Sequence, residues 1–202
     1  MSHVSISPPA TKAAHRTAHR TARIIGRWMV SFLGFPLGGF AALALAEPVD
    51  SAGNALIGGL ITGIVLGAVQ GWALRANRRR LIAWTIATAV GLSAGLGLGA
   101  WLVDYQTSIG DLALQGAVTG AFVGLAQAIL LRRRTQALAL IWPLCLAGAY
   151  ALGWVVTTAG GIAVEDQFTT FGAYGALTVA ALTSVLPVVL SGRPTDTEVR
   201  SS

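Results

Sequence analysis

The sequence predicts an all-α integral membrane protein with six transmembrane helices. Three observations predict this class: an apolar composition, six uncharged stretches of sufficient length, and the sorting of the charges between them. Hydrophobic residues make up 54% of the 202 residues and charged residues only 11%, whereas soluble domains carry about 25% charged residues. The chain therefore lacks the polar surface of a water-soluble fold.

Six stretches are free of charged residues, at 28–46, 51–74, 81–103, 112–131, 135–164 and 167–192. Each can hold a helix of about 20 residues, which crosses the roughly 30 Å hydrocarbon core of a bilayer. Backbone polar groups must be satisfied internally in lipid, so only helices or a closed barrel can span it. The stretches lack the alternation of barrel strands, which favours helices.

The charges fall on alternate connections between these stretches. All 14 basic residues precede the first stretch, join the second to the third or the fourth to the fifth, or follow the sixth. The other connections carry only acids: Glu47, Asp50, Asp104, Asp111, Glu165 and Asp166. The positive-inside rule then predicts a multi-pass protein of the cell membrane, inner or plasma, with both termini in the cytoplasm. The six tryptophans lie near the ends of the stretches, which is typical of interface anchors.

One alternative shortens the membrane domain. The segment 40–46 ends in Ala44-Leu45-Ala46 before Glu47 and resembles a signal-peptidase site. Cleavage there would leave five helices. The long region of about 27 residues before the apolar core and the place of the first stretch in the repeat described next favour six.

The chain contains an internal repeat. Residues 59–70 match 116–127 at five of twelve positions, including Thr62 with Thr119 and Gln70 with Gln127. A fainter third copy begins at Gly175 and aligns Thr178 with Thr119. These matches predict three parallel helical hairpins, at about 28–74, 81–131 and 135–192, arranged as a pseudo-threefold bundle.

Small residues recur every four positions in the stretches. The glycines of this pattern are Gly59, Gly63, Gly67, Gly71, Gly91, Gly95, Gly99, Gly116, Gly120 and Gly124. Such glycine-zipper stripes line a pore or a subunit interface in some proteins, but more commonly they let helix backbones approach each other. We expect helix packing.

No stretch contains an Asp, Glu, Lys, Arg or His, which argues against proton-driven or ion-coupled transport. The intramembrane polar residues are Thr62, Gln70, Thr119, Gln127 and Thr178. They could line a selectivity constriction, or they could join helices by hydrogen bonds. The second interpretation is favoured, with the hydroxyls bonded to carbonyls one turn earlier.

The residue types of a catalytic, cofactor or metal site are scarce. Cys145 is the single cysteine, all three histidines precede the first stretch, and the one lysine is Lys12. No catalytic, cofactor-binding or metal-ligating residue is therefore predicted, and no cofactor. The outer acids could hold a hard cation, but helix capping by Asp50 or Ser51, by Asp111, and by Thr169 or Thr170 explains most of them.

The terminal segments differ in composition. Residues 1–27 form a basic tail in which a helix would gather Arg16, Arg20, Arg23 and Arg27 on one face, an arrangement suited to anionic lipids of the cytoplasmic leaflet. Residues 193–202 are expected to be disordered. Nucleic-acid binding is not expected, because the basic residues flank the spans.

These patterns favour a non-enzymatic membrane protein that acts as a structural or accessory subunit or as a lipid-binding scaffold. Its partners would be the bilayer with its anionic lipids and a larger membrane complex or further copies of the chain. A passive channel or small-solute transporter with a path lined by Thr and Gln is the alternative. A membrane enzyme is the least supported class, since no nucleophile–base pair is present.

Overall fold

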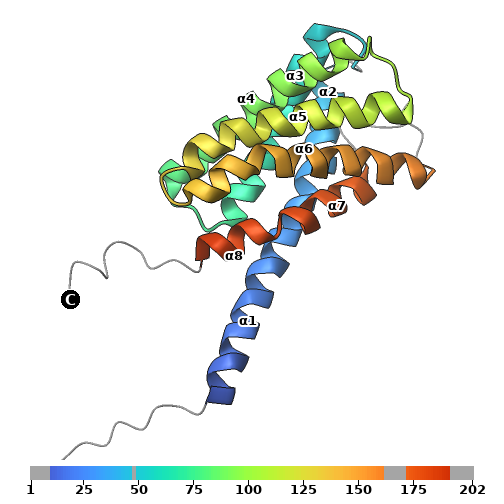
Figure 1. The fold of residues 1–202 in the computed structure, drawn as a ribbon. Coiled ribbons are helices and arrows are strands. Elements are labelled where there is room, and N and C mark those ends of the chain that lie inside the picture. The colour runs from blue at the N-terminus through green and yellow to red at the C-terminus, as the bar shows by residue number, and fades with distance from the viewer. Residues whose placement is uncertain (1–9, 47–48, 162–171, 192–202) are drawn as a thin grey trace, which may run out of the picture.

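The computed structural model describes residues 10–46, 49–161 and 172–191, and every element in these ranges is a helix (Figure 1). The predicted disordered tail at 193–202 lies outside the described residues. The elements are α1 (Ala10–Met29), the 3₁₀-helix η1 (Val30–Leu33), α2 (Gly34–Leu45), α3 (Ala52–Ala73), α4 (Arg78–Leu102), α5 (Ile109–Leu131), α6 (Gln136–Ala159), α7 (Ala173–Thr183) and α8 (Val185–Ser191).

Six helical spans in the described residues are long and apolar enough to cross a membrane, which indicates a multi-pass membrane protein. The first span combines α1 from His15 onward with η1 and α2, the second to fifth are α3, α4, α5 and α6, and the sixth combines α7 with α8. Their bounds are His15–Leu45, Ala52–Ala73, Arg78–Leu102, Ile109–Leu131, Gln136–Ala159 and Ala173–Ser191.

Polar side chains fix the starts of three spans. The side chains of Ser51, Asn77 and Ser108 each accept a hydrogen bond from the backbone N–H three residues later, in α3, α4 and α5 respectively. Each cap satisfies one of the orphan amides of a helix start. The expectation that Asp111 caps α5 is wrong: Ser108 is the cap, so α5 begins at Ile109, and Asp111 bonds back to the Ser108 hydroxyl. Thr169 and Thr170 lie outside the described residues.

A proline follows the break in the first span and the break in the sixth span. Pro36 has no N–H for the Phe32 carbonyl, and the chain tightens to the 3₁₀-helix η1 at this point. Pro187 has no N–H for the Thr183 carbonyl, and α7 ends at Thr183. Pro143 lies inside α6, yet α6 remains a single helix.

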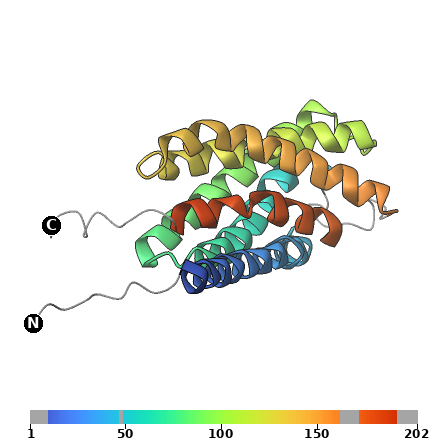
Figure 2. The same ribbon diagram turned by 60° about the horizontal axis from the view of Figure 1, so that its bottom comes forward.

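The spans pack as neighbours in chain order, and the sixth returns to the first. Contacts join α2 to α3, and so on to α7, and α7 then contacts η1 and α2. Figure 2 shows the α3–α4 and α5–α6 turns at the same end of the bundle as α1 and the end of α8. One continuous apolar core takes side chains from all six spans, including Phe35, Leu66, Leu92, Val123 and Val179.

Glycines lie where helix backbones come closest. A Cβ on Gly63 of α3 would lie 2.5 Å from Cα of Ala89 in α4, and one on Gly91 of α4 would lie 2.7 Å from Cα of Val123 in α5. The other glycines of the stripes are also buried, and a Cβ added to any of them would approach the next helix at 3.2 Å or less: Gly59, Gly67, Gly71, Gly95, Gly99, Gly116, Gly120 and Gly124. Larger residues there would force the helices apart.

The tryptophans do not all lie at the lipid-facing surface. Trp72 and Trp101 are 53% and 62% exposed, as interface anchors would be, but Trp28, Trp84, Trp142 and Trp154 are buried. Position along a span was therefore a poor guide to exposure. For Trp28, Trp84 and Trp142, the structure supplies a partner for the indole N–H inside the core.

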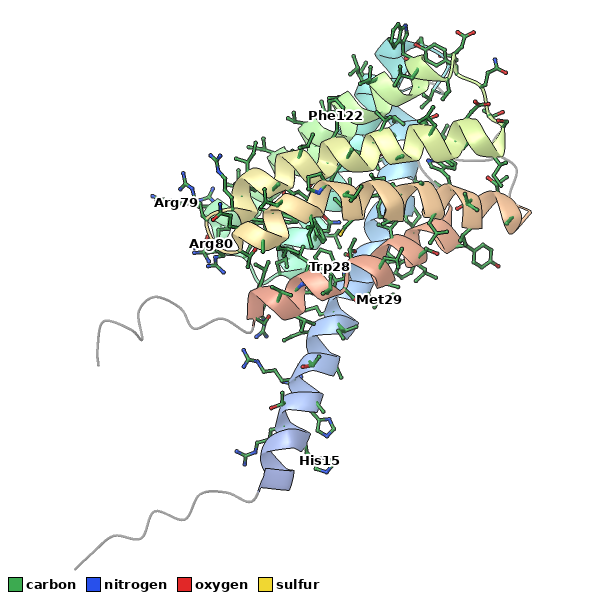
Figure 3. The ribbon with its side chains drawn as sticks, in the orientation of Figure 1. His15, Trp28, Met29, Arg79, Arg80 and Phe122 are labelled. Atoms are coloured by element: carbon green, nitrogen blue, oxygen red, sulfur yellow. The ribbon has the colours of Figure 1, made fainter. Side chains whose placement is uncertain are left out.

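The basic amphipathic segment continues the first span. The N-terminal part of α1 projects from the bundle, and residues 15–20 are all exposed (Figures 1 and 3). The base of α1 is held by two arginines that donate to helix C-terminal carbonyls. Arg27 donates through Nε and Nη2 to the carbonyl of Ala73, at the end of α3, and Arg20 donates to the carbonyl of Ser191, at the end of α8. Cations are favourable at these negative helix ends.

Candidate functional site

A buried network of amides and indoles joins four spans near the end of the bundle that carries the arginine turns. It consists of Gln70 from α3, Trp84 and Thr88 from α4, Gln127 from α5 and Trp142 from α6. Each of these side chains is at most 8% exposed. We call these five residues the amide network.

The hydrogen bonds of the network run in a continuous chain. The Trp84 indole donates to Oε1 of Gln70 at 3.0 Å, and Nε2 of Gln127 donates to the same oxygen at 3.4 Å and to the Thr88 hydroxyl at 2.9 Å. The Trp142 indole donates to Oε1 of Gln127 at 2.8 Å. The Thr88 hydroxyl donates to the Trp84 carbonyl one turn earlier at 2.9 Å.

Close backbone contacts allow these side chains to meet. Beside Gln70, a Cβ on Gly67 would lie 2.7 Å from Cα of Thr85, so α3 and α4 nearly touch. Beside Gln127, a Cβ on Gly124 would lie 2.4 Å from Cα of Pro143. The small residues of the repeat therefore draw paired helices together where the amides lie, and an indole from the next helix reaches across.

Both polar groups of the Gln127 amide are paired. Its carbonyl oxygen accepts from one indole, and its amide nitrogen donates twice. Buried polar groups with such partners specify one packing arrangement, since an unpaired group in the core is costly. None of the five side chains titrates near neutral pH or acts as a strong nucleophile, so the arrangement suits helix association better than proton transfer or covalent catalysis.

A fourth indole bond joins the ends of the chain. The Trp28 indole donates to the Thr183 hydroxyl at 3.1 Å, and this hydroxyl donates to the Val179 carbonyl at 2.7 Å. Trp28 belongs to the first span and Thr183 to the sixth, and both side chains are buried. Figure 3 places Trp28 where the first span passes the junction of α7 and α8.

The predicted threonines are not brought together with the glutamines. Thr119 donates to the Gln115 carbonyl one turn earlier, and Thr178 is only partly buried and donates to the Tyr174 carbonyl. Thr62 is fully buried against the backbone of Gly38, and its hydroxyl has no partner among the described residues.

Sequence reasoning missed the indole donors, Thr88 and Thr183. A signal for two of the indoles was present: a tryptophan follows Gln70 by 14 residues and Gln127 by 15, in each case across an arginine turn. In a helical hairpin, this spacing places the tryptophan on the second helix at about the same level along the bundle as the glutamine on the first. Thr183 carries no such signal, since its partner lies 155 residues earlier.

The predicted lipid-contact arginines divide into two pairs. Arg20 and Arg27 donate to helix C-termini, and the Arg27 guanidinium also lies 6.0 Å from the ring centroid of Trp72. Arg16 and Arg23 are exposed on α1. The arginine turns add seven further exposed side chains: Arg75, Arg78, Arg79, Arg80, Arg132, Arg133 and Arg134. Figure 3 labels Arg79 and Arg80 at this end of the bundle.

The acidic end offers no assembled cation site in the part of the chain that is described, where no three His, Cys, Asp or Glu side chains gather. Asp50 accepts from the side-chain amide of Asn54, and Asp111 accepts from the Ser108 hydroxyl. Glu47, Glu165 and Asp166 lie outside the described residues.

Comparison of the chain with protein-family models, with curated protein sequences and with solved structures finds no match. Function is therefore inferred from the contacts and charges of this chain.

Proposed function

We propose that this protein is a non-enzymatic membrane scaffold, a tightly packed bundle that binds anionic lipid at its arginine-rich end and serves as a structural or accessory subunit of a membrane assembly. The observation that carries the proposal is the pairing of both polar groups of the Gln127 amide inside the main core, to which all six spans contribute. A permeation path needs polar groups that face the solute, whereas the oxygen and the nitrogen of the Gln127 amide are already paired with protein.

Three parallel hairpins with pseudo-threefold symmetry account for the bonds between spans. The donors Trp28, Trp84 and Trp142 are separated by 56 and 58 residues. Their acceptors Gln70, Gln127 and Thr183 are separated by 57 and 56 residues. The indole of the third span thus donates to the second span, that of the fifth span to the fourth, and that of the first span to the sixth. An arginine turn joins the helices of the first two pairs, whereas the third pair lies at the two ends of the chain. In this register Thr183, rather than a residue aligned through Thr178, corresponds to Gln127.

The arginines supply the lipid-binding part of the proposal. Because α4 and α5 are antiparallel neighbours, Arg78, Arg79 and Arg80 lie at the same end as Arg132 and Arg133. Of the 14 basic residues only Lys12 is not arginine, and the guanidinium fork matches phosphate oxygens better than an ammonium does. With this end in the cytoplasm, as the positive-inside rule predicts, the partner is the anionic headgroup layer of the cell membrane.

One observation favours the alternative of a passive channel. The Thr62 hydroxyl is fully buried without a partner in the described residues, and a buried hydroxyl normally bonds to protein or to water. Water held there would be the start of a hydrated path.

Substitution of Gln127 separates the two functions. Gln127→Leu removes three hydrogen bonds and leaves the Trp142 indole unpaired. The scaffold proposal expects no solute flux in liposomes of the parent protein and a loss of about 1–2 kcal/mol in the free energy of unfolding of the variant, since interhelical bonds in membranes contribute about 0.6 kcal/mol each. Gln136→Leu, at an exposed position of α6, is the control and should change neither.

Flux in the parent that disappears in Gln127→Leu, with the unfolding transition unchanged, would overturn the scaffold in favour of the channel.

The lipid-binding part of the proposal is tested separately by the melting temperature in nanodiscs. The parent should melt at a higher temperature in phosphatidylglycerol than in phosphatidylcholine, and the triple variant Arg78→Gln, Arg79→Gln, Arg80→Gln should lose most of that difference. An equal difference in parent and variant would contradict binding at this arginine cluster.

A further inference from the structure

The first and sixth spans are interrupted at the level where they face each other. In the first span η1 begins two residues after Trp28, and in the sixth span Ser184 separates α7 from α8. Both interruptions lie just before a proline, Pro36 and Pro187. Proline breaks are common hinge positions in helices because a main-chain bond is missing there.

Contacts between the two spans are spread over several short elements. The segment α1 packs against α8 and, over a short length, against α7, η1 packs against α7, and α2 meets α7 only over a short length. The Trp28–Thr183 bond crosses the contact at the breaks, and the exposed Arg20–Ser191 bond crosses it at the end of α8. The contact therefore consists of separate small parts rather than one long helix–helix surface.

The other two indole-bonded contacts are more strongly joined. A turn of only four residues joins α3 to α4 and α5 to α6, at 74–77 and 132–135. In each pair the indole N–H donates to a glutamine side-chain amide. At the contact of the first and sixth spans no turn joins the helices, and a hydroxyl replaces the amide. The Thr183 hydroxyl keeps its bond to the Val179 carbonyl when Trp28 leaves, so separation leaves only the indole N–H unpaired in the core. The Arg20–Ser191 bond, which is also broken, is exposed.

We propose that the bundle opens laterally at the sixth span, which separates from the first span about the breaks at Ser184 and η1 while α3 to α6 stay fixed. Opening exposes the buried side chains of Phe35, Val179 and Leu186 to the bilayer, so the chemical class that would enter is the apolar chain of a lipid. This inference goes beyond the scaffold proposal, which holds for a permanently closed bundle as well.

Distances between spin labels test the opening in the full chain in nanodiscs. In a Cys145→Ser background, Val30→Cys and Val185→Cys place labels at exposed positions of the two spans, 39% and 50% exposed. The matched control pair, Ile64→Cys with Ile86→Cys, reports on α3 and α4 at similarly exposed positions. We expect two distance populations for the first pair and a single narrow one for the control. A single narrow population for both pairs would overturn the proposal.

Substitutions of Thr183 should move the populations in opposite directions. Thr183→Gln supplies the amide found at the other two contacts and should favour the short distance, and Thr183→Val removes the acceptor and should favour the long one. Failure of both variants to shift the distribution would also contradict the hinge.

Hydrogen exchange of the unlabelled parent covers the case in which labelled variants do not fold. Amides of 173–191 should exchange about tenfold or more faster than those of 52–73 and 109–131, as expected for a locally opening unit. Equal protection of all six spans would exclude lateral opening.

Discussion

The four central spans and the two outer spans of the chain are built from similar residues but differ in continuity. The helices α3 to α6 contain 22 to 25 residues each and are unbroken, whereas the first and sixth spans are divided at prolines. Proline alone does not explain the difference, because α6 contains Pro143 and remains helical. Pro143 packs directly on the backbone at Gly124. A proline in a span therefore does not by itself divide the helix.

The largest expected effect comes from filling the glycine contacts of the central spans. A Cβ on Gly120 would lie 2.2 Å from the carbonyl oxygen of Leu146 and would push α5 away from α6. Gly120→Ala should lower the free energy of unfolding by about 3 kcal/mol, the upper part of the range for overpacking. Reversible unfolding in mixed detergent measures it.

Gly148→Ala is the control for this substitution, because nothing lies within 4 Å of the added Cβ and the residue is within α6. It should be neutral or stabilising by about 0.5–1 kcal/mol, the helix preference of Ala over Gly. If the two alanines had equal effects, close backbone packing would not be what stabilises the central spans.

Two indole substitutions compare a central contact with the contact of the chain ends. Trp142→Phe leaves Oε1 of Gln127 without its donor in the core, whereas Trp28→Phe leaves a Thr183 hydroxyl that still donates to Val179. We expect a loss of about 1–2 kcal/mol for Trp142→Phe beyond the cost of the smaller ring, from an unsatisfied buried acceptor, and less for Trp28→Phe. Unfolding curves of both variants against the parent provide the measurement. The reverse order would mean that the ends of the chain are the better-joined region.

A smaller effect is expected at the base of α1. Arg27→Gln removes the charge that caps the C-terminus of α3 through the Ala73 carbonyl. The loss should be about 0.3–1 kcal/mol, as for a cation at a helix C-terminus. The melting temperature in uncharged detergent reports this contact without a lipid contribution. Arg16→Gln, on the exposed part of α1, should have no effect there, and an equal decrease for both would contradict a specific cap.

The helical class and the six spans were predictable because hydropathy and length suffice to locate spans, and the structure describes six helices that meet both criteria. The exact first residues of the helices were less predictable. The helix α5 begins three residues before Leu112, the start of the predicted stretch, because Ser108 caps it. Gln70 and Gln127 were identified as the buried polar pair, and the structure joins them directly.

Burial of the tryptophans and the role of Thr183 could not be read from the sequence. An indole at the end of a span is equally suited to the headgroup layer and to a buried acceptor, and only the rotation of the helix decides between them. Thr178 matches the repeat by local sequence similarity, but the face that α7 turns to the core carries Val179, Ala180 and Thr183. That face depends on contacts with the first span, which no local pattern contains.

The Trp28–Thr183 bond also has a consequence for the order of synthesis and membrane insertion. The first span leaves the ribosome long before its partner, since 155 residues separate the two side chains. Until the sixth span follows, the indole of Trp28 and the core-facing side of the first span lack their final neighbours. The contact between the first and sixth spans, which are the first and last to be synthesised, therefore forms last and closes the ring of spans. A nascent chain arrested before residue 183 should expose this side to membrane chaperones.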